Sequence, residues 1–176
     1  MSRFVHLHTH SHYSLLEALP KIPDLVEKAK KCGMKTLALT DSGNLYGAIE
    51  FYKECREQGI KPIIGVDFYV ATRTRLDKEA RIDNERTRLV LLAENNVGYK
   101  NLLKLVTASY LEGFYYKPKV DVNLLEKYKD GLILLSGCIS SYTAKFIVQG
   151  KYAEANNKLL KFKDIFDKDF YLEIQP

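Results

Sequence analysis

The sequence predicts an α/β fold in which strands and helices alternate along one domain. Three observations predict it: short apolar runs of strand length recur along the chain, segments with helical spacing lie between them, and several of those segments end in glycine. The apolar runs are mostly continuous, as is typical of parallel strands buried on both faces. An α/β barrel and a doubly wound sheet both fit this order. The sequence contains neither a G-x-G-x-x-G motif nor a P-loop, which disfavours a nucleotide-binding doubly wound sheet.

The first part of the chain predicts three strands and two helices. Leu25, Ala29 and Cys32 have the spacing of one helix face, and Gly33 and Gly59 are suited to end the two helices because glycine adopts the left-handed conformation without strain. In order, we predict a strand at 3–10, a helix at 21–33, a strand at 36–41, a helix at 45–59 and a strand at 61–71.

The second part of the chain begins with a highly charged segment, 72–88, which we interpret as an exposed and mobile excursion. Asn123 is placed to cap a helix, with Glu126 at the capping-box position and Gly131 at its end. We predict strands at 89–95, 132–137 and 170–174, and helices at 97–113, 123–131 and 152–166. The whole chain then holds six strands.

Composition sets limits on the function. With 176 residues, 46% hydrophobic and 28% charged, the chain fits one globular domain at residues 1–176, and its net charge of +5 permits contact with nucleic acid without requiring it. The three cysteines are scattered, which favours reduced thiols. The sequence shows neither a membrane-length apolar run nor a signal-peptide core, so we expect a cytoplasmic protein with no membrane partner.

All four histidines of the chain lie at alternate positions of one stretch, His6, His8, His10 and His12. In an extended segment such side chains share a face, and two of them are about 6.5 Å apart at Cα. Both imidazoles can then reach one metal ion at about 2.0–2.1 Å. An isolated pair of histidines is weak evidence, and we interpret His6 and His12 as ordinary satisfied or solvated side chains.

Further polar residues lie at or near the ends of later predicted strands. Asp41 and Ser42 follow the second strand, Asp67 lies within the third, and Cys138 follows the fifth. In α/β barrels the carboxyl ends of the strands meet at one face, which carries the active site. We therefore expect these residues to lie close to His8 and His10.

Residues 4–71, from "FVHLHTHSHYS" to "KPIIGVDFYVA", resemble the N-terminal PHP (polymerase and histidinol phosphatase) domain of the bacterial replicative DNA polymerase III alpha subunit. The later stretches "LVLLAENNVGYKNLLKL" and "EKYKDGLILLSGC" resemble the same domain, so the similarity covers essentially the whole chain. The resemblance implies a distorted barrel of seven parallel strands, incomplete here with about six. It also implies a cluster of up to three metal ions at the carboxyl ends of the strands.

The resemblance implies a set of candidate metal ligands. His8 and His10 match the first metal motif of the family, and Glu17 stands where an aspartate ligand is usual. Asp67 in "GVDFYV" replaces a glutamate, and Cys138 in "LSGC" matches a cysteine ligand. The last two ligands of the family, an Asp-x-His pair, would lie beyond the last residue. The expected metals are zinc, manganese or magnesium, bound weakly or not at all.

Two departures from the family pattern predict a degenerate site. Ser42 in "TDSG" and Arg88 in "NERTRLVLLA" stand where the family has histidine ligands. A serine hydroxyl is a poor replacement for imidazole, and an arginine keeps its proton and cannot bind a metal. We predict instead that the guanidinium of Arg88 lies among Glu17, Asp41 and Asp67 and supplies the positive charge of a lost ion.

The function implied by the resemblance is that of the N-terminal PHP module of a DNA-directed DNA polymerase, with a structural role or a role in docking a proofreading exonuclease subunit. Its expected partners are the polymerase core of the same parent chain and, through that core, DNA. The catalytic aspartates of the polymerase are not in this chain, so we expect a piece of a larger chain or a truncated gene product that is inactive by itself. One alternative is a metal-dependent 3′–5′ exonuclease, phosphoesterase or pyrophosphatase. Another, a free-standing phosphatase of the histidinol-phosphate type, is disfavoured by the polymerase-like "NNVGYKNLLKL".

Overall fold

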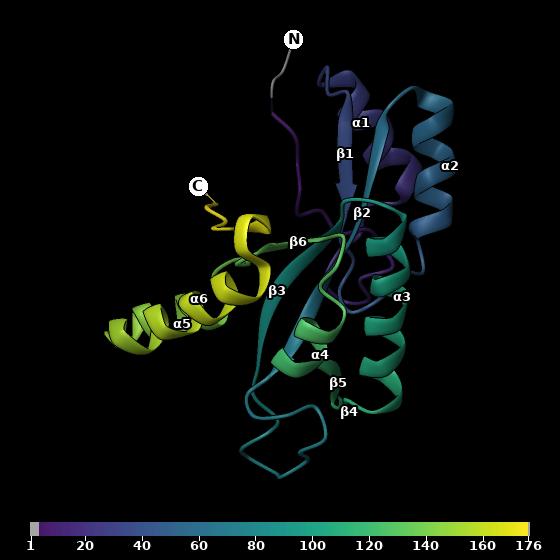
Figure 1. The fold of residues 1–176 in the computed structure, drawn as a ribbon. Coiled ribbons are helices and arrows are strands. Elements are labelled where there is room, and N and C mark those ends of the chain that lie inside the picture. Colours follow the sequence, from purple (N-terminus) through teal and green to yellow (C-terminus); the bar gives the residue numbers. More distant parts are fainter. Residues whose placement is uncertain (1–3, 176) are drawn as a thin grey trace.

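The fold is an open, mixed α/β sheet with helices packed around it, seen in a computed structural model that describes residues 4–175 (Figure 1). The strands are β1 (Thr36–Leu39), β2 (Lys61–Ala71), β3 (Arg86–Ala93), β4 (Phe114–Tyr115), β5 (Lys117–Val120), β6 (Leu132–Leu135) and β7 (Phe170–Tyr171). The helices are α1 (Ile22–Lys31), α2 (Ala48–Gln58), α3 (Asn96–Leu111), α4 (Val122–Lys127), α5 (Tyr142–Val148) and α6 (Tyr152–Phe166), and a 3₁₀ turn spans Asp167–Asp169.

The sheet has the strand order β4-β5-β2-β3-β6-β7, and β1 pairs with the first half of β2. The β1–β2, β2–β5 and β6–β7 pairs are parallel, whereas β3 runs antiparallel to both β2 and β6. The prediction of a parallel sheet is therefore wrong at β3. A strand buried on both faces is continuously apolar whichever way it runs, so the sequence does not reveal its direction.

The predicted first strand is also wrong: no strand is assigned in residues 4–10, and Arg3 lies outside the described residues. The segment still runs along β1, where the amide of Ala38 donates to the carbonyl of His6 at 3.0 Å and the amide of Thr40 donates to the carbonyl of Thr9 at 2.8 Å. These two bonds hold the segment in place without forming a ladder. The histidine stretch thus reaches the carboxyl end of β1, where the candidate metal ligands were predicted to meet.

Most of the other predicted elements are confirmed. The structure places β2 and α6 at the predicted bounds, and the remaining predicted helices and strands overlap α1, β1, α2, β3, α3, α4, β6 and β7. Helix α4 is capped by Asp121, which accepts from the amide of Leu124, so the predicted capping by Asn123 is wrong. The sequence analysis missed β4, β5 and α5, which are short or carry few apolar residues.

The charged segment 72–88 is more ordered than its composition suggests. Much of it is exposed, but the Asp83 side chain is buried and accepts a hydrogen bond of 3.0 Å from Nε of Arg73. The backbone carbonyl of Asp83 accepts from the fully buried Lys119. The first contact lies within the segment, the second fastens it to β5, and β3 already begins at Arg86.

Among the described residues, three apolar clusters hold the layers together, and two of them contact helices. The largest joins β2, β3 and β6 to α3, α4 and α6, with Phe68, Leu91 and Leu105 fully buried. The second joins β1 to α1 and α2 around Phe51. Helix α5 has no buried residue and packs beside α6 (Figure 1). Within residues 4–175, no helix is both long and apolar enough to cross a membrane.

Candidate metal centre

Three side chains with metal-binding atoms meet where the histidine segment passes β2. His8 Nε2 is 3.3 Å and His10 Nε2 is 3.2 Å from Oδ2 of Asp67, whose side chain is only 1% exposed. One ligand atom from each residue lies within 4.8 Å of the others. Two imidazoles and one carboxylate can therefore face one point. The two histidine rings are 5.2 Å apart, so they share a side of the segment as their spacing predicts.

Arg88 on β3 lies against the same carboxylate. Its Nε is 3.2 Å from Asp67 Oδ2, and its Nη2 donates to Oε2 of Glu17 at 2.7 Å. The arginine side chain is 18% exposed. Its guanidinium therefore forms ion pairs with two carboxylates from different parts of the chain, as expected for a residue that replaces a cation.

Glu17 is held by a polar cluster next to Asp67. The hydroxyl of Ser42 donates to Glu17 Oε2 at 2.6 Å, and the hydroxyl of Tyr69 donates to Oε1 at 2.8 Å. Lys117 Nζ lies 3.9 Å from the same Oε1. Arg88 also donates to the Ser42 hydroxyl at 2.6 Å and lies over the Tyr69 ring, 4.7 Å from its centre. The Ser42 hydroxyl thus donates to the Glu17 carboxylate and accepts from the Arg88 guanidinium.

These contacts fix the charges of the site. Burial lowers the pKa of His8, but hydrogen bonds to Asp67 and Glu173 outweigh it and raise that pKa to about 10. His8 is therefore protonated at neutral pH, and its Nδ1 donates to Glu173 Oε1 at 2.8 Å. Burial raises the pKa of Asp67, but its contacts with the two histidines and with Arg88 hold the pKa below its usual value. The site therefore sets protonated His8 and Arg88, with Lys117 nearby, against the carboxylates of Glu17, Asp67 and Glu173.

The Glu17 carboxyl should make the fold sensitive to acid. Burial raises its pKa, but the hydrogen bonds that it accepts outweigh burial and lower the pKa from 4.5 to about 2. A lowered pKa in the folded state adds stability that is complete above pH 4.5 and is lost as the pH falls towards 2. We expect Glu17→Gln to be less stable than wild type at pH 7 and to approach it at pH 3, as measured by urea unfolding.

The matched control is Glu154→Gln on the exposed surface of α6. Its difference from wild type should stay constant over the same pH range. A Glu17→Gln difference that is equally constant would contradict the prediction, because it would mean that ionised Glu17 gains nothing from its partners in the folded state.

Asp41 lies next to Asp67, whose amide donates to the Asp41 carbonyl at 3.1 Å, but its side chain points to the loop after the histidines. Its buried carboxylate accepts from the amide of Ser11 at 2.7 Å and from the hydroxyls of Ser11 and Ser14 at 2.8 and 2.7 Å. Arg88 is not among the partners that the structure describes for it, so its predicted pairing with Arg88 is not seen. Asp41 instead fastens the loop that follows the histidines.

Cys138 and the two outer histidines also lie apart from the group of His8, His10 and Asp67. The Cys138 thiol is 3.1 Å from the hydroxyl of Ser140 in the loop after β6. The His6 ring packs edge-on against Phe4, and the His12 ring packs against Tyr13. The described side-chain contacts of these three residues are local.

Glu173 and Tyr69 belong to the site but were missed in the sequence. Glu173 follows β7, and Gln175 donates to its Oε1 at 2.7 Å. Glu173 lies just after a strand, as the other candidates do, so the strand-end rule could have identified it from the sequence. Tyr69 lies two residues after Asp67 on β2 and therefore on the same face of the strand. Its hydroxyl reaches Glu17, which no sequence pattern indicates.

The donor set fits one metal ion at most. Oδ1 of Asp67 is buried without a hydrogen-bond partner among the described residues, and two imidazoles and a carboxylate suit zinc or manganese. A cluster of two or three ions does not fit, because Ser42 and Arg88 supply a hydroxyl and a fixed cation where further ligands would be needed. Even a single ion would have to face the Arg88 guanidinium, whose Nε lies 3.2 Å from Asp67 Oδ2.

Known proteins resemble this chain along nearly its whole length. The DNA polymerase III subunit alpha of Borreliella burgdorferi is 53% identical over 99% of the chain, and that of Aquifex aeolicus is 44% identical over 98%. The chain spans 15% of the length of each of these relatives. An amidohydrolase from Chromobacterium violaceum superposes with a TM-score of 0.43 at 20% identity, over 60% of this chain and 32% of that one. The model of the PHP domain matches residues 6–176, and the chain therefore belongs to the PHP domain family.

Proposed function

We propose that this chain is the N-terminal PHP module of a DNA polymerase III alpha subunit, in which Arg88 has taken the place of a metal ion. Relatives of that name match 98–99% of the chain at 44–53% identity, which supports the first part. The second part depends on one observation, the Arg88 guanidinium paired with both Glu17 and Asp67. Residues 1–176 would form one domain of the parent chain, and the open sheet would be part of a distorted barrel.

In this proposal the site stabilises the module instead of cutting a substrate. Carboxylates gathered in a poorly solvated place repel one another, and a cation among them offsets that repulsion. Arg88 and protonated His8 supply this charge, so the strand ends stay together without an ion. The module would then serve the polymerase core of the same chain, and DNA through that core, as a structural part or as a docking site for a proofreading exonuclease subunit. Work on the bacterial chromosome would place it in the cytoplasm.

A second candidate function is a metal-dependent 3′–5′ exonuclease or phosphoesterase. The grouping of His8, His10 and Asp67 favours it, because these atoms could hold one zinc, manganese or magnesium ion. Such an ion would supply a hydroxide nucleophile and offset phosphoryl charge. Two-metal hydrolysis requires ions about 3.5–4 Å apart, and the substitutions at Ser42 and Arg88 remove the ligands for a second ion.

We expect no hydrolysis of a single-stranded oligonucleotide or of p-nitrophenyl phosphate by the chain, with manganese, zinc or magnesium added. The measurement compares wild type with a His8→Ala, His10→Ala variant, which separates activity at this site from a contaminating nuclease. Equal background rates support the structural role. Activity that survives purification and disappears in the variant would favour the second candidate function.

A further inference from the structure

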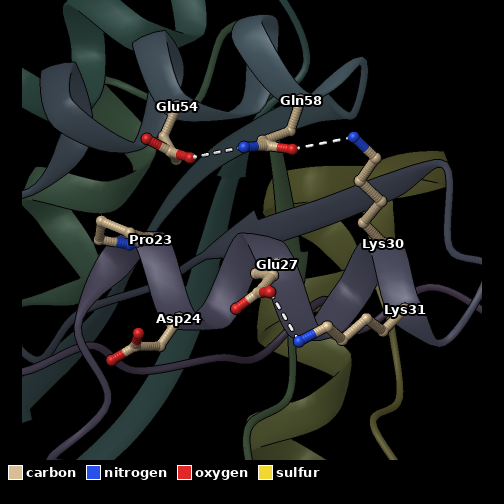
Figure 2. Close-up of a pocket in the computed structure, with 7 residues that line it drawn as sticks. All are labelled: Pro23, Asp24, Glu27, Lys30, Lys31, Glu54 and Gln58. Carbon is tan, nitrogen blue, oxygen red and sulfur yellow. Dashed lines mark hydrogen bonds and ion pairs between the residues drawn. The ribbon is translucent and has the colours of Figure 1, made fainter.

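A hollow of about 490 Å³ between α1 and α2 gathers charged side chains away from the candidate metal centre (Figure 2). Lys30 of α1 donates to Gln58 of α2 at 2.9 Å, and Lys31 pairs with Glu27 at 2.6 Å. The side chains of Lys31 and Glu27 are 68% and 58% exposed, so water screens their charges and the pair adds little stability. The charged side chains of residues 72–85 are arranged differently, because several of their partners are buried.

Residues 72–85, which we call the strap, connect β2 to β3 (Figure 1). The two strands are antiparallel neighbours, and such hairpin connections usually have about 2–5 residues. The strap is far longer, and no helix or strand is assigned within it. None of its apolar side chains is buried: Leu76 and Ile82 are 61% and 44% exposed, and Ala80 is exposed as well. Apolar burial therefore does not hold the strap in place.

One arginine closes the strap on itself. Nε of Arg73 donates to Oδ1 of Asp83 at 3.0 Å, and Nη2 of Arg73 pairs with Oε2 of Glu79 at 3.0 Å. The amide of Glu79 also donates to Oδ2 of Asp83 at 2.9 Å. The Asp83 side chain is only 2% exposed, and Arg73 compensates its charge within the strap.

A second arginine, Arg75, joins the strap to the ends of two helices. Its amide and its Nη1 each donate to Oδ2 of Asp121 at 3.0 Å, and its Nε donates to Oε2 of Glu112 at 2.7 Å. Asp121 is the buried N-cap of α4, and Glu112 is the C-cap of α3. A cation at the end of one helix and a carboxylate at the start of another are both favoured by the helix dipoles. Arg75 is therefore the contact that fixes the strap to α3 and α4.

The strap also contacts a buried lysine of β5. Lys119 is fully buried, and its ammonium donates to the backbone carbonyl of Asp83. The same ammonium lies 5.2 Å from the centre of the Tyr115 ring. A buried ammonium is costly unless it is hydrogen-bonded and compensated. Displacement of the strap would remove the Asp83 carbonyl from Lys119 and admit water in its place.

The closed strap keeps charges out of water, which offsets much of what its ion pairs contribute. Asp83, Asp121 and Lys119 are all buried while the strap is in place. Removing charges from water is costly, so buried ion pairs add little net stability over the same charges in water. When the strap moves away, these groups regain water. A segment that is held by ion pairs and lacks buried apolar side chains should open more readily than the core beneath it.

We propose that the strap is a latch that opens as a unit while the sheet stays folded, that Arg75 holds it closed, and that its opening exposes Lys119. The strap thus controls the access of water and of reactive small molecules to a lysine that the closed fold hides. The inference goes beyond the proposed function. It is independent of the replacement of a metal ion by Arg88, because no described contact of the strap involves the candidate metal centre.

Acetylation kinetics at Lys119 test the proposal in the 176-residue chain. N-hydroxysuccinimidyl acetate is used at a low extent of reaction, and mass spectrometry reports the rate at each lysine. We expect wild-type Lys119 to react far more slowly than Lys78, an exposed lysine of the strap. Arg75→Gln should speed the reaction at Lys119 at least about 10-fold, because a hydrogen bond to a charged group typically changes such an equilibrium by roughly 10- to 150-fold.

Two variants and one urea series make the test specific. The matched control Lys78→Gln removes the same charge from an exposed strap position without a described side-chain partner, and it should leave the Lys119 rate unchanged. Arg75→Lys keeps the charge but loses the planar fork, so its rate should be intermediate. In the wild type, acetylation of Lys119 should depend weakly on urea and hydrogen exchange of the β3 amides strongly, because opening the latch exposes much less surface than global unfolding.

Three results would overturn the proposal. One is wild-type acetylation of Lys119 as fast as that of Lys78, which would mean that the strap does not cover it. Another is a Lys119 rate that Arg75→Gln leaves unchanged. The third is equal urea dependence of Lys119 acetylation and β3 exchange, which would mean that Lys119 is reached only by global unfolding. The urea series uses the wild-type chain alone, so it decides the matter even if Arg75→Gln does not fold.

Discussion

Arg88→Ala should cost the fold about 3 kcal/mol or more of its free energy of unfolding at neutral pH. Removing one member of a buried ion pair typically costs about 3–5 kcal/mol, because the other charge is left uncompensated. Asp67 is only 1% exposed and would lose the guanidinium that lies 3.2 Å away. His8 and His10 would still contact it, which places our expectation at the lower end of the range.

Two further variants make this measurement specific. Adding Asp67→Asn to Arg88→Ala should recover part of the loss, because the uncompensated carboxylate is then gone. Lys31→Ala serves as the matched control, since it breaks an ion pair of 2.6 Å whose members are 68% and 58% exposed. Such exposed pairs contribute about 0–1 kcal/mol. If Arg88→Ala costs no more than Lys31→Ala in urea unfolding, the guanidinium does not compensate buried charge.

Asp41→Ala should be comparably destabilising, at about 4 kcal/mol. The buried carboxylate accepts three hydrogen bonds from Ser11 and Ser14, and a hydrogen bond to a charged group contributes about 1.5–3 kcal/mol. Its loss would leave the Ser11 amide and two hydroxyls without this acceptor. Because Ser11 follows His10 directly in the chain, the histidine segment should also become more mobile.

The test of the Asp41 prediction combines stability with local motion. Urea unfolding gives the free energy, and hydrogen exchange of the amides around Ser11 reports the loop. Asp41→Asn should lose less, since the amide oxygen still accepts while the charge is removed. Equal protection of the Ser11 amide in wild type and Asp41→Ala would contradict the role that we assign to this carboxylate.

The elements with strong local signals could be predicted from the sequence, and pairings across the sheet could not. Helix α6 and strand β2 have the predicted bounds because their apolar spacing and flanking residues are local properties. The antiparallel direction of β3 depends on how the chain returns to the sheet, which the apolar run of Leu89 to Leu92 does not encode. Residues 4–10 have the composition of a strand but form only two backbone bonds to β1 and its end.

The candidate site also contains residues that the sequence could predict and contacts that it could not. His8 and His10 were predictable because residues two apart in an extended segment share a face. The contact of Arg88 with Glu17 joins residues 71 positions apart, and its prediction required knowledge of what the family places there. Glu173 lies 165 positions from its partner His8, so no local pattern joins the two. The strand-end rule locates Asp41 beside Asp67 but does not give the direction of its side chain, which bonds Ser11 and Ser14.

The most direct test of the replacement of a metal ion by Arg88 is elemental analysis of metal content after purification without chelators. We predict that the wild-type chain holds clearly less than one equivalent of zinc, manganese or other transition metal. A Ser42→His, Arg88→His double variant should hold more, because it removes the fixed cation and adds two imidazole ligands beside His8, His10 and Asp67. One or more tightly held equivalents in the wild-type chain, unchanged in the double variant, would contradict the account.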